Sequence, residues 1–84
     1  MRTVTYSREA LKALDKMPAN TARLLRSKAE QYATNPASLA NNLKALHGVP
    51  GYCRLRVGDW RLIFREDGLV VTVTRIAARG SVYD

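Results

Sequence analysis

The sequence predicts one small α+β domain, in which an antiparallel sheet carries a helical hairpin packed on one face, in the element order β-α-α-β-β-β. Two observations lead to this fold class. Apolar residues recur at helical spacing in the first half of the chain, whereas the second half alternates apolar and polar residues between turn signals. A chain of 84 residues can bury one modest core, so residues 1–84 are expected to form a single domain.

The first half begins with a short β-prone segment at Thr3–Tyr6. Ser7 has the side chain of a helix N-cap, and it precedes a predicted first helix of about ten residues that Pro18 ends. The spacing that indicates this helix is carried by Ala10, Leu11, Leu14 and Met17.

A second helix is predicted to be capped by Asn20 or Thr21 and closed by the pair Asn35-Pro36. Helices of this length are marginal alone in water, so both are expected to need the sheet as a packing partner. The apolar stripe that would face the sheet consists of Ala22, Leu25, Ala29, Tyr32 and Ala33.

The connection at residues 37–51 gives a weaker pattern, with leucines at 39, 43 and 46 spaced as core contacts and turn residues at 48–51. Three strands are predicted after it, at 52–57, 60–65 and 69–76. The turns Gly58-Asp59 and 66–68 suit antiparallel hairpins. In the last strand Val71 and Val73 would point to one face of the sheet and Ile76 to the other. A bulge near Arg75 would bring all three to the same face.

Arginines occupy one face of the predicted hairpin. Because side chains alternate between the two faces of a strand, the apolar residues can form a core while the arginines form a guanidinium array. The apolar set is Cys53, Leu55, Val57, Trp60, Leu62 and Phe64, and the arginines are Arg54, Arg56, Arg61 and Arg65. Guanidinium groups pair well with phosphate, so this face is predicted to grip a polyanion.

Composition narrows the function classes. A formal charge of +7 favours nucleic acid, an acidic protein or a membrane surface as partner. No segment has the apolar length of a bilayer span and the first residues lack a signal-peptide pattern, so we expect a cytoplasmic protein without a membrane partner. The lone Cys53 is expected to be a buried structural thiol. The sequence contains no metal-ligand cluster and no phosphate-binding glycine loop, so neither metal nor cofactor is expected.

The segment 43–64, which reads LKALHGVPGYCRLRVGDWRLIF, and the ending RIAARGSVYD together resemble the RelE/ParE superfamily of bacterial toxins. These proteins are the toxic halves of type II toxin–antitoxin pairs. The resemblance implies the fold predicted above. For RelE-type members it also implies cleavage of mRNA in the ribosomal decoding site, where the ribose 2′-OH attacks the adjacent phosphate.

The motif positions of the superfamily carry over to five residues as catalytic candidates: Arg54, Arg56, Arg61, Arg79 and Tyr83. Such a reaction needs a base for the 2′-OH, a stabiliser for the phosphorane charge and an acid for the leaving oxygen.

Two departures from the family pattern concern the base. Relatives often have a histidine at the position of Ala78. RelE itself has the pattern Lys-x-Lys at the positions where this chain has Arg54 and Arg56. Arginine keeps its proton in the physiological range and is a poor base. The single histidine, His47, lies in a predicted loop outside the motif positions.

Further contacts to RNA are predicted at Tyr52, Arg65 and Arg75 on the strands, and at Lys12, Lys16, Arg23 and Arg26 on the helices. Tyr52 can stack on a base or pack half-buried against the sheet. The helical cations can contact rRNA phosphates or simply be solvated.

The resemblance leaves three functional classes open. The first is a ribosome-dependent mRNA endonuclease that needs no metal and inhibits translation. The second is a ParE-like inhibitor of DNA gyrase without nuclease chemistry, and the third is a degenerate scaffold that binds only an antitoxin. The expected partners are a cognate antitoxin, the ribosome with mRNA, and operator DNA bound as a toxin–antitoxin complex.

Overall fold

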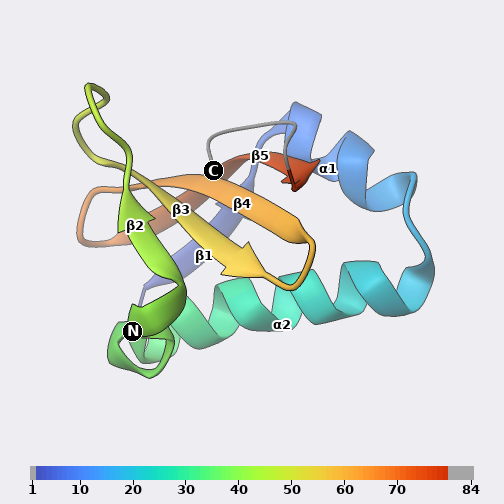
Figure 1. Cartoon of the computed structure of the whole chain (residues 1–84), viewed down its shortest axis with the longest axis horizontal. Helices are drawn as coiled ribbons and strands as arrows, with labels where there is room; N and C mark the ends of the chain where they lie inside the picture. The colour runs from blue at the N-terminus through green and yellow to red at the C-terminus, as the bar shows by residue number, and fades with distance from the viewer. Residues whose placement is uncertain (1, 80–84) are drawn as a thin grey trace.

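A computed structural model describes residues 2–79 of the chain, which form a five-stranded sheet with helices against it (Figure 1). The predicted α+β fold class is confirmed. In chain order the elements are β1 (Thr3–Tyr6), α1 (Arg8–Asp15), α2 (Ala19–Thr34), the 3-10 helix η1 (Pro36–Asn42), β2 (Leu43–Ala45), β3 (Tyr52–Val57), β4 (Trp60–Glu66) and β5 (Val70–Ala78).

The sheet is mixed rather than purely antiparallel. Its strand order is β1-β5-β4-β3-β2, and β1 runs parallel to β5, with Thr3 opposite Val70 and Tyr6 opposite Val73. The other neighbouring pairs are antiparallel. The direction of the β1–β5 pair differs from the prediction because the partners lie more than 60 residues apart, and no local pattern records which strands become neighbours.

Two elements in the weakly patterned connection were not predicted. The 3-10 helix η1 follows α2 directly, and β2 then pairs with β3, placing Leu43 opposite Leu55. A strand of three residues is too short to show alternation, so only its pairing identifies it.

The predicted hairpin and bulge are both confirmed. Val57 lies opposite Trp60, which leaves Gly58-Asp59 as a two-residue loop, and Gly58 has the positive φ of 59° that such tight loops require. Between β4 and β5 the register shifts after Ile63, which is opposite Arg75, so that Phe64 is opposite Val73. Thr74 is therefore the extra residue of a bulge next to Arg75.

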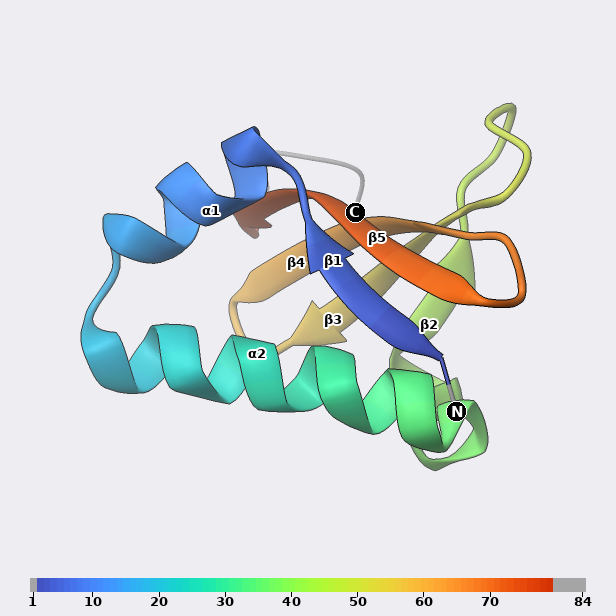
Figure 2. The ribbon, with the colours of Figure 1, turned by 180° about the vertical axis from the view of Figure 1, so that it is seen from behind.

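Both helices contribute to the core on one face of the sheet, and Figure 2 shows α2 running along that side. Ser7 caps α1 as predicted: its hydroxyl accepts a hydrogen bond from the Ala10 amide (3.1 Å) and donates one to the Thr74 carbonyl (2.7 Å). The predicted cap of α2 is wrong, since α2 begins at Ala19 and its N-cap is Pro18, which makes no side-chain cap bond.

The core lies between α1, α2 and the helix-facing side chains of the strands. Phe64, Leu25, Leu55 and Leu62 are almost completely buried, and the Tyr32 ring meets the Phe64 ring at a centroid distance of 4.6 Å. Cys53 is partly buried against this core, in line with its predicted structural role. No helix within residues 2–79 has the length and apolar character needed to cross a membrane.

Candidate functional site

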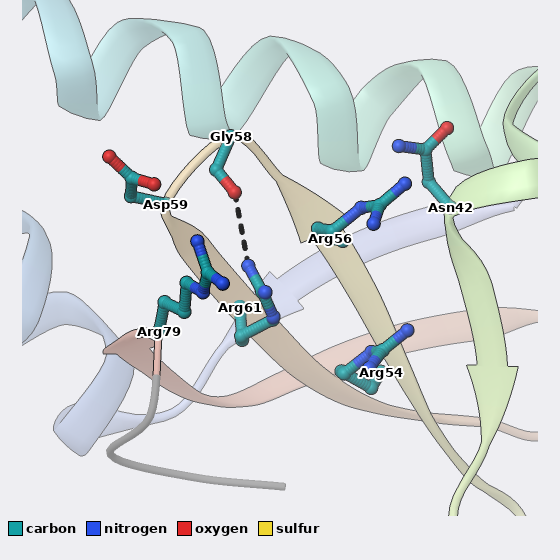
Figure 3. Close-up of a pocket in the computed structure, with 7 residues that line it drawn as sticks. All are labelled: Asn42, Arg54, Arg56, Gly58, Asp59, Arg61 and Arg79. Atoms are coloured by element: carbon teal, nitrogen blue, oxygen red, sulfur yellow. Dashed lines mark hydrogen bonds between the residues drawn. The ribbon is translucent and has the colours of Figure 1, made fainter. Parts of the chain in front are cut away.

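A cleft of about 710 Å³ opens on the face of the sheet that the helices leave uncovered (Figure 3). Its lining comes from β3, β4, the turn between them, the end of η1 and the residue after β5. The lining residues are Asn42, Arg54, Arg56, Gly58, Asp59, Arg61 and Arg79. The structure therefore brings together four of the five residues predicted to be catalytic. The fifth, Tyr83, lies outside the described residues.

Strand pairing fixes the spacing of these arginines. Arg54 and Arg56 are two residues apart on β3, and Arg56 is the direct cross-strand partner of Arg61 on β4. Like charges directly opposite one another destabilise a sheet. A polyanion bound beside these facing arginines would offset the repulsion between their like charges.

Arg61 is the most buried of the four, with 6% of its surface exposed. Its Nη1 donates to the carbonyl of Gly58 (3.0 Å) and to that of Trp60 (3.1 Å), which holds the guanidinium against the β3–β4 turn (Figure 3). A guanidinium fixed in this way loses little freedom when an anion binds.

The other two arginines differ in their surroundings: Arg79 is held through its backbone, and Arg54 has a buried Nε. The backbone amide of Arg79 donates to the carbonyl of Asp59 (2.7 Å), so the residue after β5 is held beside the β3–β4 turn while its side chain stays exposed. The Nε of Arg54 is buried and has no hydrogen-bond partner among residues 2–79. A buried donor without a partner is uncommon in folded proteins.

Sequence reasoning missed three lining residues, Asn42, Gly58 and Asp59, of which Gly58 was interpreted only as part of the turn. Asp59 was interpreted only as a turn residue, although its place in the turn next to the arginines was the available signal. Asn42 had no signal, because it reaches the cleft only when η1 and β2 pack along β3. Within residues 2–79, Asp59 is the one carboxylate that lines the cleft, beside four arginines.

Three of the other predicted RNA contacts lie on the same face but do not line the cleft. Tyr52 is half-buried and faces the exposed Arg65 across β3 and β4. The Nε of Arg75 lies 3.4 Å from Oε2 of Glu9, at the start of α1. These residues extend the basic surface beyond the cleft.

The predicted contacts on the helices lie apart from the cleft. Lys12 is exposed on α1 and Lys16 is exposed at its C-cap. Arg23 and Arg26 line a separate groove of about 430 Å³ between α1 and α2. The Arg26 guanidinium lies over the Tyr6 ring, 5.0 Å from its centroid, as a cation–π pair. Contact of these four with RNA stays a prediction.

Groups that could act as a base or nucleophile are scarce near the cleft. His47 lies in the exposed turn after β2 and is absent from the lining. Burial, reinforced by the Glu66 carboxylate, raises the pKa of the Cys53 thiol, which keeps it protonated and inert. Within residues 2–79 no cluster of three His, Cys, Asp or Glu side chains could hold a metal ion. The cleft is equipped to bind and stabilise negative charge.

A comparison with protein families identifies the chain. Residues 4–83 match the family described as the ParE toxin of the type II toxin–antitoxin system parDE. The chain belongs to this family. It is therefore a toxin of a type II toxin–antitoxin system, and the resemblance to the RelE/ParE superfamily is confirmed. No curated protein sequence matches it.

Solved structures of RelE toxins have the same fold as this ParE-family chain. The RelE–RelB complex of Pyrococcus horikoshii superposes with a TM-score of 0.79 at 21% identity, covering 96% of this chain and 98% of that one. The isolated RelE toxin of E. coli gives a TM-score of 0.77 at 19% identity, covering 98% and 88%. The RelB–RelE complex of Methanococcus jannaschii gives 0.75 at 23% identity, covering 95% of both chains. At these identities the similarity shows the shared fold alone.

Proposed function

We propose that this toxin is a ribosome-dependent endonuclease that cleaves mRNA without a metal ion and so inhibits translation. The observation that carries the proposal is the convergence of Arg54, Arg56, Arg61 and Arg79 on one open cleft. A single-stranded RNA phosphate is small enough to be contacted by several of these groups at once, and Arg–phosphate contacts are charge-assisted.

Each part of the cleft has a role in the proposed reaction. Arg54 and Arg56 hold the phosphates, while Arg61 and Arg79 stabilise the charge that develops on the phosphorane. Tyr83, at its motif position, completes the catalytic set. The ribosome holds the 2′-OH in line with the phosphate, so that orientation supplies rate in place of a strong base. No cofactor enters this reaction.

Gyrase inhibition is the second candidate, favoured by one observation: the family that matches is ParE. In that case the arginines would contact the acidic surface of a protein rather than a scissile phosphate. The scarcity of bases among the lining residues fits this alternative as well.

We also propose a cognate antitoxin as partner in the cytoplasm, and operator DNA as a ligand of the toxin–antitoxin complex. The similar structures from P. horikoshii and M. jannaschii contain RelE together with RelB. A charge of +7 favours an acidic antitoxin segment that folds as it covers the arginine face, the helices or both. Co-expression with neighbouring reading frames should yield a stable complex and restore growth, and failure of every such frame would count against this partner.

The deciding experiment measures two activities of one preparation: cleavage of mRNA on purified ribosomes, and supercoiling by DNA gyrase. We expect an mRNA fragment that ends in the decoding site, which disappears in Arg79→Ala and persists in Arg8→Ala. Arg8 is an exposed cation on α1, so its replacement removes the same charge away from the cleft. Gyrase inhibition without cleavage would favour the second candidate, and loss of both activities in the wild type would leave an antitoxin-binding scaffold.

A further inference from the structure

A second, smaller hollow of about 230 Å³ adjoins the arginine cleft on the same face of the sheet. It lies between the β2–β3 loop, the middle of β4, the bulge of β5 and the start of α1. Its lining residues are Glu9, Leu46, Val49, Tyr52, Ile63, Thr74 and Arg75.

The floor of this hollow is apolar, unlike the rest of the face. Ile63 has the same strand parity as Arg61 and Arg65, yet only 4% of its surface is exposed. Leu46 and Val49 of the β2–β3 loop add further apolar lining to the hollow.

Backbone hydrogen bonds hold that loop in place. The Leu46 amide donates to the Tyr52 carbonyl (2.9 Å), and the Tyr52 amide donates to the Val49 carbonyl (3.2 Å). The apolar walls are therefore positioned without a ligand.

Polar groups stand at the rim. Glu9 and Arg75 form an ion pair (3.4 Å) that presents carboxylate acceptors and guanidinium donors side by side. The Thr74 hydroxyl donates to the Ile63 carbonyl (3.2 Å) and lies on the bulge. A planar ligand with apolar faces and a hydrogen-bonding edge matches this combination.

The distance between the two cavities suits one nucleotide. Ile63 is the cross-strand partner of Arg54 and lies two residues from Arg61, and Tyr52 lies two residues from Arg54. At the rise of a β-strand, two residues correspond to about 7 Å. A phosphate held by the arginines therefore has its own or the adjacent base within reach of the hollow.

We propose that this hollow binds one unstacked nucleobase of the RNA whose phosphate lies in the arginine cleft, an inference that rests on the proposed function. The Tyr52 ring and the aliphatic side chains contact the faces of the base, and the Glu9–Arg75 pair contacts its edge. The cavity is smaller than the ~300–1,000 Å³ typical of sites for drug-sized ligands, and it suits a single base.

The test measures the affinity of the toxin for ribosomes programmed with mRNA in which one nucleotide at a time in the decoding site is abasic. An abasic nucleotide keeps the phosphate and ribose and removes only the base. Stacking of a base on an aromatic side chain corresponds to about a 5- to 150-fold change in affinity. We expect a loss of this size at one position of the mRNA and little change at the neighbouring positions.

Variants assign that loss to the hollow. In Tyr52→Leu and in Leu46→Ala, the abasic nucleotide should lower the affinity for the programmed ribosome by less than it does in the wild type. In Tyr52→Phe the loss of affinity should be as large as in the wild type. Leu69→Ala is the matched control for Leu46→Ala, because Leu69 is 78% exposed and does not line the hollow. Should Tyr52→Leu destabilise the sheet, Leu46→Ala still tests the site, since it changes only a loop side chain.

The outcomes separate this inference from the proposed function. Cleavage with equal affinity for every abasic mRNA would overturn the base site and leave the nuclease intact. The base site would also be overturned if the abasic nucleotide lowered the affinity of Tyr52→Leu and Leu46→Ala by as much as that of the wild type. Absence of binding and cleavage with every RNA would overturn both proposals.

Discussion

The two faces of the sheet use the same strands for opposite purposes. On the face covered by the helices, Leu55 and Leu62 are each 1% exposed and belong to the core. On the other face the neighbouring residues of the same strands are Arg54, Arg56 and Arg61, which line an open cleft. Stability is concentrated on one face and charge on the other, so substitutions should separate folding from activity.

The separation is incomplete at two positions of the open face. Arg61 is 6% exposed and Ile63 is 4% exposed, values typical of a core. Arg61 is hydrogen-bonded to the β3–β4 turn, and Ile63 lines a hollow together with Leu46 and Val49 of the β2–β3 loop. The binding face thus contains anchored residues whose replacement should affect both folding and function.

The largest expected effect contrasts the two faces directly. Phe64→Ala removes a ring that is 2% exposed and in contact with Tyr32, and it should lower the free energy of unfolding by about 3–5 kcal/mol. Arg56→Ala, on the exposed face, should change it by less than about 0.5 kcal/mol. Urea unfolding measures both, and equal losses would contradict the division of roles.

The next effect concerns catalysis by the arginines. Arg79→Ala and Arg61→Ala should each reduce the cleavage rate about a hundredfold, or roughly 3 kcal/mol of transition-state stabilisation. Arg79 is exposed, so its variant should unfold like the wild type.

Arg61→Ala should in addition lose about 1 kcal/mol of stability, because it removes two hydrogen bonds to backbone carbonyls. Comparing the two variants in one assay therefore distinguishes an exposed from an anchored arginine. Full growth inhibition by both soluble variants would exclude the proposed roles.

A third prediction tests the helix-covered side through its polar network. The Tyr32 hydroxyl donates to Oε1 of Glu66 (2.6 Å), and Arg2 pairs with the other oxygen of that carboxylate. A hydrogen bond to a charged group contributes about 2 kcal/mol, so Tyr32→Phe should be destabilised by about this amount at neutral pH.

The same network predicts a pH dependence. Burial, and then the hydrogen bond to Glu66, raise the pKa of Tyr32 above its ordinary value of 10.0. The folded protein holds this proton more tightly than the unfolded chain, so the stabilisation is complete below pH 10 and declines as pH rises further. The difference in unfolding free energy between wild type and Tyr32→Phe should shrink above pH 10. A constant difference would contradict the assignment.

The smallest expected effect is that of His47. His47→Ala should keep nearly full activity, because the residue lies in the exposed β2–β3 turn and does not line the cleft. Cleavage should show no titration between about pH 5.5 and 8, the range in which a histidine base would change charge. A rate that follows such a titration and is abolished by His47→Ala would refute a mechanism without a histidine base.

Restoring a base provides the converse experiment. Arg54→Lys and Ala78→His each introduce a group that gives up its proton more readily than arginine. Faster cleavage in either variant would identify this toxin as a slowed nuclease. Absence of cleavage by the wild type and by both variants would favour gyrase inhibition over mRNA cleavage as the function.

The sequence by itself determined the features that depend on near neighbours in the chain. Alternation along residues 52–57 and 60–65 separated core residues from arginines, and Gly58-Asp59 specified the hairpin. Ser7 marked the start of α1, and the parity conflict around Arg75 located the bulge. Local conformation and side-chain direction follow from such short-range preferences.

The error at the start of α2 also has a local origin. Asn20 and Thr21 have cap-forming side chains, but the chain is already helical from Ala19, and Asn20 Oδ1 accepts from the adjacent Thr21 amide (3.0 Å). Pro18, with a φ of −55°, already directs the backbone into the helix.

Only the tertiary structure decided which distant segments meet. It placed β1 parallel to β5, brought Asn42 and Arg79 to the cleft, and set Leu46 and Val49 of the β2–β3 loop around the same hollow as Ile63. A period-two pattern specifies the two faces of a strand but neither its neighbours nor what covers each face. Which strands become neighbours, and what covers each face, depend on how much apolar surface the whole chain can bury. That amount is determined by contacts between residues far apart in sequence.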